Sequence, residues 1–406
     1  MKRIYLDFAA TTPVKKAVLS EMSQYFSNEF GNASSIHSFG QQARHAIDKA
    51  RSNLSSFLNC QASEIIFTSG ATESNNLAIK GFIQAISGQS IPHIITSSIE
   101  HHSVLDTCKY LEKNKLAEVT YLAVSKKGIV DIEEVQKAIK ENTVLISIMY
   151  VNNEIGTVQP IREIGKLIEK ENRDREKNHS NLSSLSQIYF HTDAVQAIEY
   201  FNHDVAHLHV DMLSLSAHKI GGPKGIGALY IKKGTPLQPQ IIGGWQENRR
   251  RAGTENVAGI VGLGKAIEEL KIVNCKLKIK KIQGLRDRFI KGILQNIPDV
   301  ILNGDSILRS PNNANFCFNY IEGESILLNL DLQGVAASSG SACTSGSLEP
   351  SHVIMALGRD HRTAQGSIRF TLGEGLTNSD IDYVIKILPK IVKKLRKMSP
   401  FGGKRD

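Results

Sequence analysis

The sequence has few cysteines and no long apolar run, and each shortage argues against a class of protein. Its five cysteines are Cys60, Cys108, Cys275, Cys317 and Cys343. An odd number without a close pair argues against a disulfide framework and against a cysteine-rich zinc site, and it favours a reducing compartment. No run of about 18 apolar residues occurs, and Asp7 interrupts the short apolar stretch at the amino terminus. We therefore expect a cytoplasmic protein that is neither secreted nor inserted in a membrane.

Acidic residues are also fewer than basic ones. The chain has 49 Lys and Arg against 40 Asp and Glu, a net charge of +9, and such an excess favours acidic partners or substrates. The basic residues are spread along the chain apart from two lysine-rich stretches, Lys276 to Arg288 and Lys386 to Lys397. Both are typical of solvated helix faces, so we expect no direct binding of nucleic acid.

Short β-rich apolar runs alternate with longer amphipathic segments through the first part of the chain. Examples of these runs are Ile65 to Phe67, Val144 to Tyr150 and Met212 to Leu215. This alternation predicts an α/β fold, with a mainly parallel mixed sheet between helices. A chain of 406 residues is long enough for two domains. We expect an arm at 1–15 that packs with the small domain, a large domain at 16–256 and a small α/β domain at 257–406.

The stretch LSAHKIGGPKGIG, which begins at Leu215, places Lys219 just beyond a predicted strand. A lysine that is shielded from water can lose its proton near neutral pH and act as a Schiff-base nucleophile. Most lysines in such a place are simply solvated. The catalytic interpretation therefore depends on what the other strand ends carry.

Three other predicted strand ends carry groups that pyridoxal phosphate would need. In TSGATESNN, the helix that opens at Ala71 and Thr72 could bind a phosphate through its free N–H groups. In HTDAVQ, Asp193 could pair with the ring nitrogen, and in SIEHH, His101 could stack on the ring. Each has an ordinary explanation as well: a common turn, a helix N-cap and a packed histidine.

Longer motifs show a resemblance to one family. They are YLDFAATTP from Tyr5, SGATESNNLA, VNNEIG from Val151, SAHKIGGPKG, RRAGTENV from Arg250, SSGSACTSGSLEPS from Ser338 and SIRFTLG from Ser367. With these motifs the chain resembles, nearly end to end, the cysteine desulfurases of the NifS/IscS type. These are class V aminotransferases within the fold-type I pyridoxal-phosphate enzymes. Trp245 departs from the pattern, because it stands where the family has a third glycine.

The resemblance implies a role for each matching residue around the cofactor. Lys219 would form the Schiff base, Asp193 would pair with the ring nitrogen, Gln196 would bond the ring phenol oxygen and His101 would cover the ring. The residues implied in binding the phosphate are Ala71, Thr72, Ser216 and His218, with Thr254 reaching in from the second subunit. The active unit would thus be a homodimer. Asn153, beside the cofactor, and Arg369 would receive the substrate carboxylate.

Cys343 lies in a stretch, Ser338 to Ser347, that is rich in serine and glycine and almost free of apolar residues, as exposed loops are. The resemblance implies that its thiol takes sulfur from L-cysteine as a persulfide, leaving L-alanine, and that it could briefly ligate an iron-sulfur cluster. The sulfur would pass to an iron-sulfur scaffold or to a tRNA-thiolation protein.

Other functions remain open at this point. A selenocysteine lyase or a small-amino-acid aminotransferase shares the fold, although Cys343 argues against an aminotransferase. A sulfur carrier or scaffold that has lost turnover and a basic nucleic-acid-binding module are further alternatives.

Overall fold

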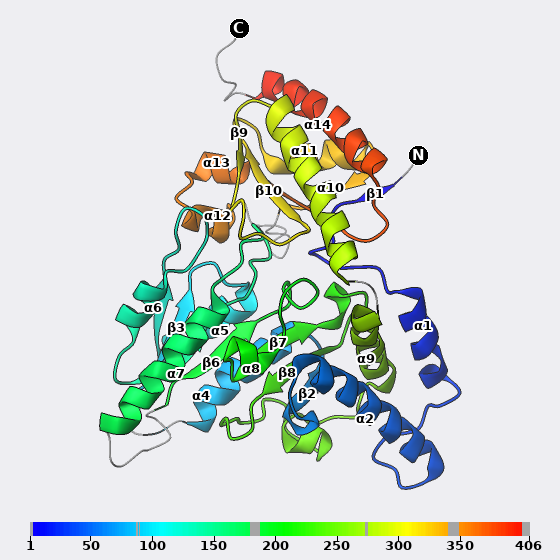
Figure 1. Cartoon of the computed structure of the whole chain (residues 1–406), viewed down its shortest axis with the longest axis vertical. Coiled ribbons are helices and arrows are strands. Elements are labelled where there is room, and N and C mark those ends of the chain that lie inside the picture. Colours follow the sequence, from blue (N-terminus) through cyan, green and yellow to red (C-terminus); the bar gives the residue numbers. More distant parts are fainter. Residues whose placement is uncertain are drawn as a thin grey trace.

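The structure, a computed structural model, describes residues 3–86, 88, 90–178, 187–272, 275–339 and 349–399. The chain forms a large body around one sheet and a smaller body stacked on it (Figure 1). The amino-terminal segment runs beside the smaller body and then down to the large one (Figure 1). The domain limits predicted at residues 15 and 256 stay predictions.

The large body is built on a seven-stranded sheet in the order β2-β8-β7-β6-β5-β3-β4. The strands are β2 (Ile65–Thr68), β3 (His93–Ser97), β4 (Glu118–Leu122), β5 (Thr143–Ser147), β6 (Tyr189–Asp193), β7 (Met212–Ser216) and β8 (Gly227–Ile231). Neighbouring strands pair in parallel from β4 to β7, and β8 runs antiparallel to both β7 and β2. This mainly parallel mixed sheet confirms the predicted α/β class.

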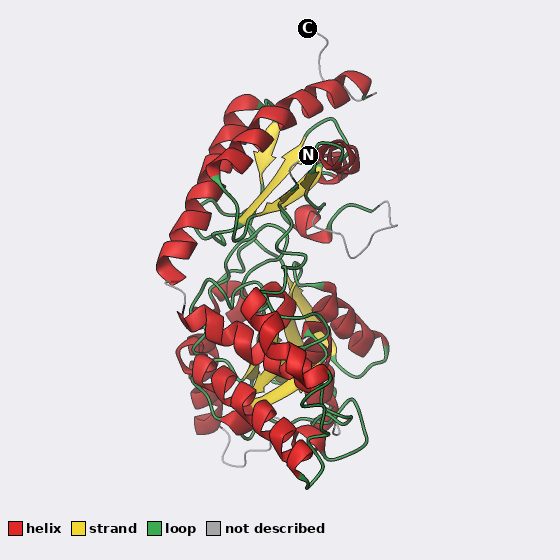
Figure 2. Ribbon diagram, turned by 90° about the vertical axis from the view of Figure 1, so that its right-hand side faces the viewer, coloured by secondary structure: helices red, strands yellow, loops and turns green. Residues whose placement is uncertain are grey.

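Helices cover both faces of this sheet (Figure 2). They are α1 (Lys16–Ser23), α2 (Ser38–Leu58), α3 (Ala71–Asn76), α4 (Phe82–Ala85), α5 (His102–Lys113), α6 (Ile132–Ala138), α7 (Ile161–Asn178), α8 (Val205–Leu208) and α9 (Val257–Ile272). A π-helical turn, Leu77–Gly81, joins α3 to α4. Because the strands alternate their side chains between faces, Ile65 and Phe67 enter the core on one side, and Ile66 enters the core on the other.

The smaller body has an antiparallel sheet in the order β12-β10-β9, formed by β12 (Ser367–Thr371), β10 (Asn313–Phe318) and β9 (Val300–Leu302). Its helices are α10 (Cys275–Asn296), α11 (Gly323–Asp331), α12 (His352–Ala356), α13 (His361–Gln365) and α14 (Asn378–Met398). A core of its own includes Phe289, Phe316 and Phe370. The first strand, β1 (Ile4–Tyr5), pairs in parallel with β11 (Val335–Ala336) and thereby ties the amino terminus to this body.

The parallel strands place their carboxyl ends at one edge of the sheet, beneath the smaller body. Ligands of open α/β sheets bind at this kind of edge. In the described part of the chain, none of the helices combines the length and the apolar composition that a membrane crossing requires.

Candidate active site

Lys219 lies just past the carboxyl end of β7, in a short 3-10 helix, Ala217–Lys219. Its amine donates hydrogen bonds to the carbonyl oxygens of Ala9, at 2.5 Å, and Ala10, at 2.9 Å. Gln196 donates to the same Ala9 oxygen at 3.1 Å. The amino-terminal segment therefore joins the lysine to the turn that follows β6.

Asp193, the last residue of β6, is almost fully buried and is held by two donors. One carboxylate oxygen accepts from the Asn75 amide at 2.8 Å, and the other accepts from the Val195 backbone N–H at 3.0 Å. The Asn75 amide also donates to the Ser103 hydroxyl, whose oxygen lies 2.8 Å from Nδ1 of His101. A chain of buried hydrogen bonds thus connects the Asp193 carboxylate to the His101 ring.

His101 is the N-cap of α5, and this position fixes which ring nitrogen carries the proton. The Ser103 backbone N–H donates to Nδ1 at 3.1 Å. Burial lowers the pKa of His101; Asp193 opposes this effect, and the charge of Lys219 adds to it. A neutral His101 whose Nδ1 accepts a hydrogen bond must carry its proton on Nε2.

The turn after β2 brings the start of α3 next to the end of β7. Gly70 has a φ of +153°, a conformation that side chains rarely adopt. A Cβ atom added to Gly70 would lie 4.0 Å from the Ser216 hydroxyl oxygen, and one added to Gly227 would lie 2.7 Å from the Gly70 Cα. The backbone at Gly70 therefore packs tightly against β8 and lies beside Ser216. Ala71 and Thr72, the first residues of α3, come directly after it.

His218 lies between Lys219 and the amino-terminal segment. Its Nδ1 is 3.1 Å from the Thr11 hydroxyl, and its carbonyl accepts from both the backbone and the hydroxyl of Thr12. Burial lowers the pKa of His218 to about 4, with the nearby charges of Lys219 and Lys224 contributing. The ring is therefore neutral at pH 7.

Arg369 reaches the same region from β12 of the smaller body. Its guanidinium donates to the Asn153 carbonyl oxygen at 2.9 Å and pairs with the Asp7 carboxylate at 2.8 Å. Arg369 is 3% exposed, and its buried Nε has no hydrogen-bond partner. The Arg369 guanidinium is therefore held in place by Asn153 and Asp7, and its Nε–H group remains available as a hydrogen-bond donor.

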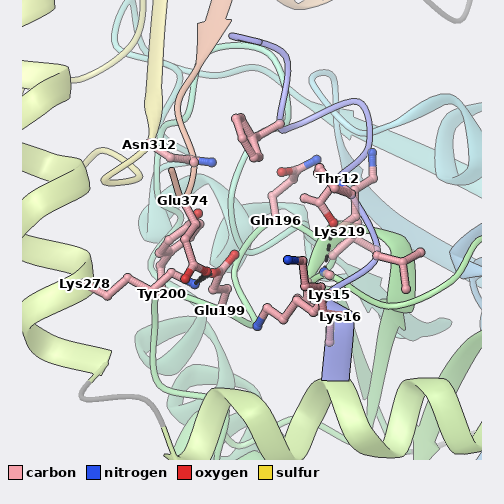
Figure 3. Close-up of a pocket in the computed structure, with 17 residues that line it drawn as sticks. Thr12, Lys15, Lys16, Gln196, Glu199, Tyr200, Lys219, Lys278, Asn312 and Glu374 are labelled. Carbon is pink, nitrogen blue, oxygen red and sulfur yellow. Dashed lines mark hydrogen bonds and ion pairs between the residues drawn. The ribbon is translucent and has the colours of Figure 1, made fainter. Parts of the chain in front are cut away.

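A cavity of about 280 Å³ lies beside Lys219 and Gln196 (Figure 3). Lys15, Glu199 and Lys278 also line it, and Lys278 pairs with Glu199 at 2.9 Å and with Glu374 at 3.1 Å. The cavity therefore opens between the amino-terminal segment and the junction of the two bodies.

Among the described residues, Thr254 makes no hydrogen bond to this group. Thr254 is exposed in the loop between the 3-10 helix Gln246–Arg249 and α9, and Arg251 in the same loop pairs with Glu73 of α3 at 2.9 Å. Trp245, the departure from the family pattern, is exposed and lies under the Arg249 guanidinium. Cys343 lies outside the described residues.

Burial raises the pKa of three other thiols. The values are about 12 for Cys60 and Cys108 and about 11 for Cys317. None of these three is a thiolate near neutral pH, so none is activated as a nucleophile.

The structure thus brings Lys219, Asp193, His101 and Gln196 to one place and links Arg369 to Asn153. It adds neighbours that the sequence reasoning did not single out: Asp7, the Ala9 and Ala10 carbonyls, Asn75 and Ser103. Asp7 and Asn75 stand inside the quoted motifs YLDFAATTP and SGATESNNLA. Those motifs could therefore have identified them as candidates.

Known proteins match the chain along almost its whole length. The family model for class-V aminotransferases matches residues 4–384. A cysteine desulfurase IscS of Dictyoglomus turgidum is 52% identical over 402 residues, which are 99% of this chain and 98% of the relative. A solved NifS-like protein has a TM-score of 0.88 at 35% identity and covers 97% of this chain and 100% of its own. A solved structure of SspA in complex with cysteine has a TM-score of 0.77 at 37% identity, over 91% of this chain and 99% of that one.

Proposed function

Since the chain belongs to the class-V aminotransferases and, among them, to the cysteine desulfurases, we propose that it removes sulfur from L-cysteine with pyridoxal phosphate. The fold is that of the fold-type I enzymes, as predicted. One observation carries the proposal: at the carboxyl edge of the parallel sheet, the His101 ring is linked to the Asp193 carboxylate through Asn75 and Ser103, and the charges of both Asp193 and Lys219 act on its pKa.

The residues present fit the cofactor. Lys219 offers an amine, Asp193 offers a carboxylate with a fixed orientation, and the tight turn at Gly70 opens a helix beside Ser216. When bound, pyridoxal phosphate supplies an electron sink for the charge left by removal of the substrate α proton. Ala71, Thr72, Ser216 and His218 would bind its phosphate, and Asp193, Gln196 and His101 would bind its ring.

The residues of the chain would then bind the substrate and move protons. Arg369, with its free Nε, and Asn153 bind the carboxylate of L-cysteine. The Lys219 amine accepts the α proton, and the His101 Nε2–H is available as a proton donor.

Cys343 would take the sulfur. Its thiolate attacks the substrate sulfur, an S–S bond forms, and the carbon–sulfur bond breaks with its electron pair left on carbon. Protonation of that carbon, together with return of the α proton from Lys219 to the α carbon, gives L-alanine. The persulfide stays on Cys343 until an iron-sulfur scaffold or a tRNA-thiolation protein accepts its outer sulfur. The same thiol could briefly ligate an iron-sulfur cluster.

We further propose a homodimer in which Thr254 binds the phosphate in the partner's site. Neighbouring exposed apolar side chains support an interface on the large body: Phe30 is 66% exposed and Phe39 48%, and their ring centroids lie 5.7 Å apart. Large apolar side chains gathered at a surface mark contact sites.

Incubation of the holoenzyme with L-cysteine tests the function. Mass analysis of the Cys343 peptide should find an added sulfur atom, and alanine should accumulate in step. In Cys343→Ser, L-cysteine should still shift the visible absorbance of the cofactor while persulfide and alanine fall to background, because an alcohol cannot store sulfur as a persulfide.

Cys60→Ser is the matched control, since Cys60 is more accessible than Cys108 and Cys317, and it should keep native activity. Alanine release at the native rate by Cys343→Ser without an added nucleophile would contradict the persulfide route. A lyase reaction, as in selenocysteine lyases, would then explain the chemistry better.

A further inference from the structure

The two lysine-rich stretches of the sequence form neighbouring helices. Helices α10 and α14 pack against each other on the outside of the smaller body (Figures 1 and 2). Phe289 of α10 and Val384 and Leu388 of α14 point into the same core. The opposite faces of both helices therefore meet the solvent.

These two helices account for the whole net positive charge of the protein. Helix α10 carries seven basic residues and one acidic residue, and α14 carries six basic and two acidic residues. Together they contribute +10, whereas the whole chain has +9, so the rest of the chain sums to −1. The charge is concentrated on one part of the surface.

We call the exposed basic side chains of the two helices the lysine face. Its members are Lys276, Lys280, Lys281, Arg288, Lys291, Lys386, Lys390, Lys393, Lys394 and Lys397. The five lysines of α14 lie within about 100° around the helix axis and form a stripe about 16 Å long. Arg288 pairs with Asp382 at 2.6 Å across the two helices on the solvent side, which makes the face continuous.

Few carboxylates compensate this charge. The exposed acids of the two helices, Asp287 and Asp382, each already pair with an arginine. Among the described residues, no ion pair involves a lysine of the lysine face. Like charges repel one another across such a face, so the carboxylates of a partner would relieve the repulsion and steer the encounter.

We propose that the lysine face docks an acidic protein. Its composition favours a protein over a nucleic acid, because protein partners bury apolar side chains at the centre of an interface and the lysine face has such side chains beside its charges. Apolar side chains stand among the lysines: Leu277 is 63% exposed, Leu294 44% and Met398 71%. Of the aromatic rings in the described part of these two helices, Phe289 is buried and Tyr383 is only partly exposed, with its hydroxyl hydrogen-bonded to the Gln333 carbonyl, so no fully exposed ring is offered to a base.

Binding of poly-L-glutamate to the full-length holoenzyme tests the proposal. The triple variant Lys386→Glu/Lys390→Glu/Lys393→Glu should weaken binding by about tenfold or more, and added salt should weaken binding to the native protein. The control triple, Lys126→Glu/Lys166→Glu/Lys170→Glu, makes the same change in net charge at exposed lysines of the large body. It should weaken binding by less than about threefold. Carbodiimide cross-links to poly-L-glutamate should map to α10 and α14.

Two results would overturn the proposal. Equal losses in both triple variants would show that only overall charge matters, and tighter binding of bulk tRNA than of poly-L-glutamate, lost in the α14 triple, would assign the face to nucleic acid. If the α14 triple does not fold, as judged by thermal unfolding, the corresponding Lys→Gln triple takes its place. Binding of poly-L-glutamate requires no turnover, so its outcome does not depend on whether the protein has the proposed desulfurase activity.

Discussion

Single buried side chains fix the orientation of the catalytic candidates. Asn75 is fully buried, and its amide holds both the Asp193 carboxylate and the Ser103 hydroxyl, which in turn contacts His101. A hydrogen bond to a buried charge is worth more than one between neutral groups. Asn75 therefore acts on the site through Asp193 and His101.

Replacing Asn75 with alanine should weaken both the fold and the site. The Asp193 carboxylate would lose one of its two donors while it stays buried, so we expect the free energy of unfolding to fall by about 2–3 kcal/mol. Cofactor affinity should fall as well. Urea unfolding and titration with pyridoxal phosphate measure the two effects. Asn76→Ala is the neighbouring control, because that side chain only donates to the Thr72 carbonyl at the surface; an equal loss in both variants would contradict the role of Asn75.

Glu100 makes the stability depend on pH. Burial raises the pKa of Glu100 to about 8; hydrogen bonds from Ser97 and the Met149 N–H oppose this, and Asp193 adds to it. Because the folded-state pKa lies above the unfolded value, Glu100 stabilises the fold fully below about pH 4.5. That contribution is lost as the pH rises toward 8, at up to about 1.4 kcal/mol per pH unit. In Glu100→Gln, urea unfolding across this range should show a flatter decline; an unchanged slope would mean that Glu100 is already ionised at neutral pH.

The sequence allows the positions of two candidate residues to be predicted, while their roles at the cofactor stay predictions. Lys219 and Asp193 stand at strand ends, which the apolar runs before them indicate. Asn75 and Asp7 were missed because their partners are distant in sequence: Asn75 lies 118 residues from Asp193, and Asp7 lies 362 from Arg369. No local pattern reports a hydrogen bond of that separation.

At the level of elements, α12 is anchored to the active-site edge. Its N-cap, Ser351, donates to the buried Glu154 carboxylate at 2.5 Å, and His352 contacts the Glu100 carbonyl oxygen at 2.9 Å. Burial raises the pKa of Glu154, while the Ser351 hydrogen bond and Arg369 oppose the rise. Glu154 directly follows Asn153 in the sequence, and Glu100 directly precedes His101. These contacts therefore place the start of α12 close to both candidate site residues.

Ser351→Ala should destabilise the protein more than loss of an ordinary N-cap. A capping side chain contributes about 1 kcal/mol, and the buried Glu154 would also lose its donor, which adds about 1–3 kcal/mol. Asp360→Ala is the matched control, because Asp360 caps the next short helix, α13, at the surface. Urea unfolding compares the two variants. Equal losses would show that the hydrogen bond to Glu154 adds nothing.

The sequence predicted the elements of the large sheet better than their long-range connections. Apolar runs bounded by turns reveal buried strands, because burial on both faces leaves an almost continuous hydrophobic signal. The pairing of β1 with β11 joins Ile4 to Val335 and gives no such signal. The passage of the amino-terminal segment past Lys219, which supplies the Ala9 and Ala10 carbonyls, could not be predicted from local patterns for the same reason.

At the scale of the whole molecule, the proposed dimer would complete each site with a residue of the second chain. Thr254 is exposed, and its loop is tied to its own large body by the pairing of Arg251 with Glu73. The exposed apolar side chains of the large body, among them Ile242 and Trp245, lie shortly before this loop in the sequence. A two-fold dimer through such a surface would place the same loop of each chain beside its partner.

Mixed dimers of Lys219→Ala and Thr254→Ala chains test this arrangement. If Thr254 serves the partner's site, one site of the mixed dimer carries both defects and the other carries neither. Alanine release should then recover to about half the native rate, above either parent variant. Dimers that combine two differently tagged Lys219→Ala chains control for the mixing procedure and should stay inactive. If instead Thr254 serves its own chain, each site keeps one defect, and verified mixed dimers will show no recovery.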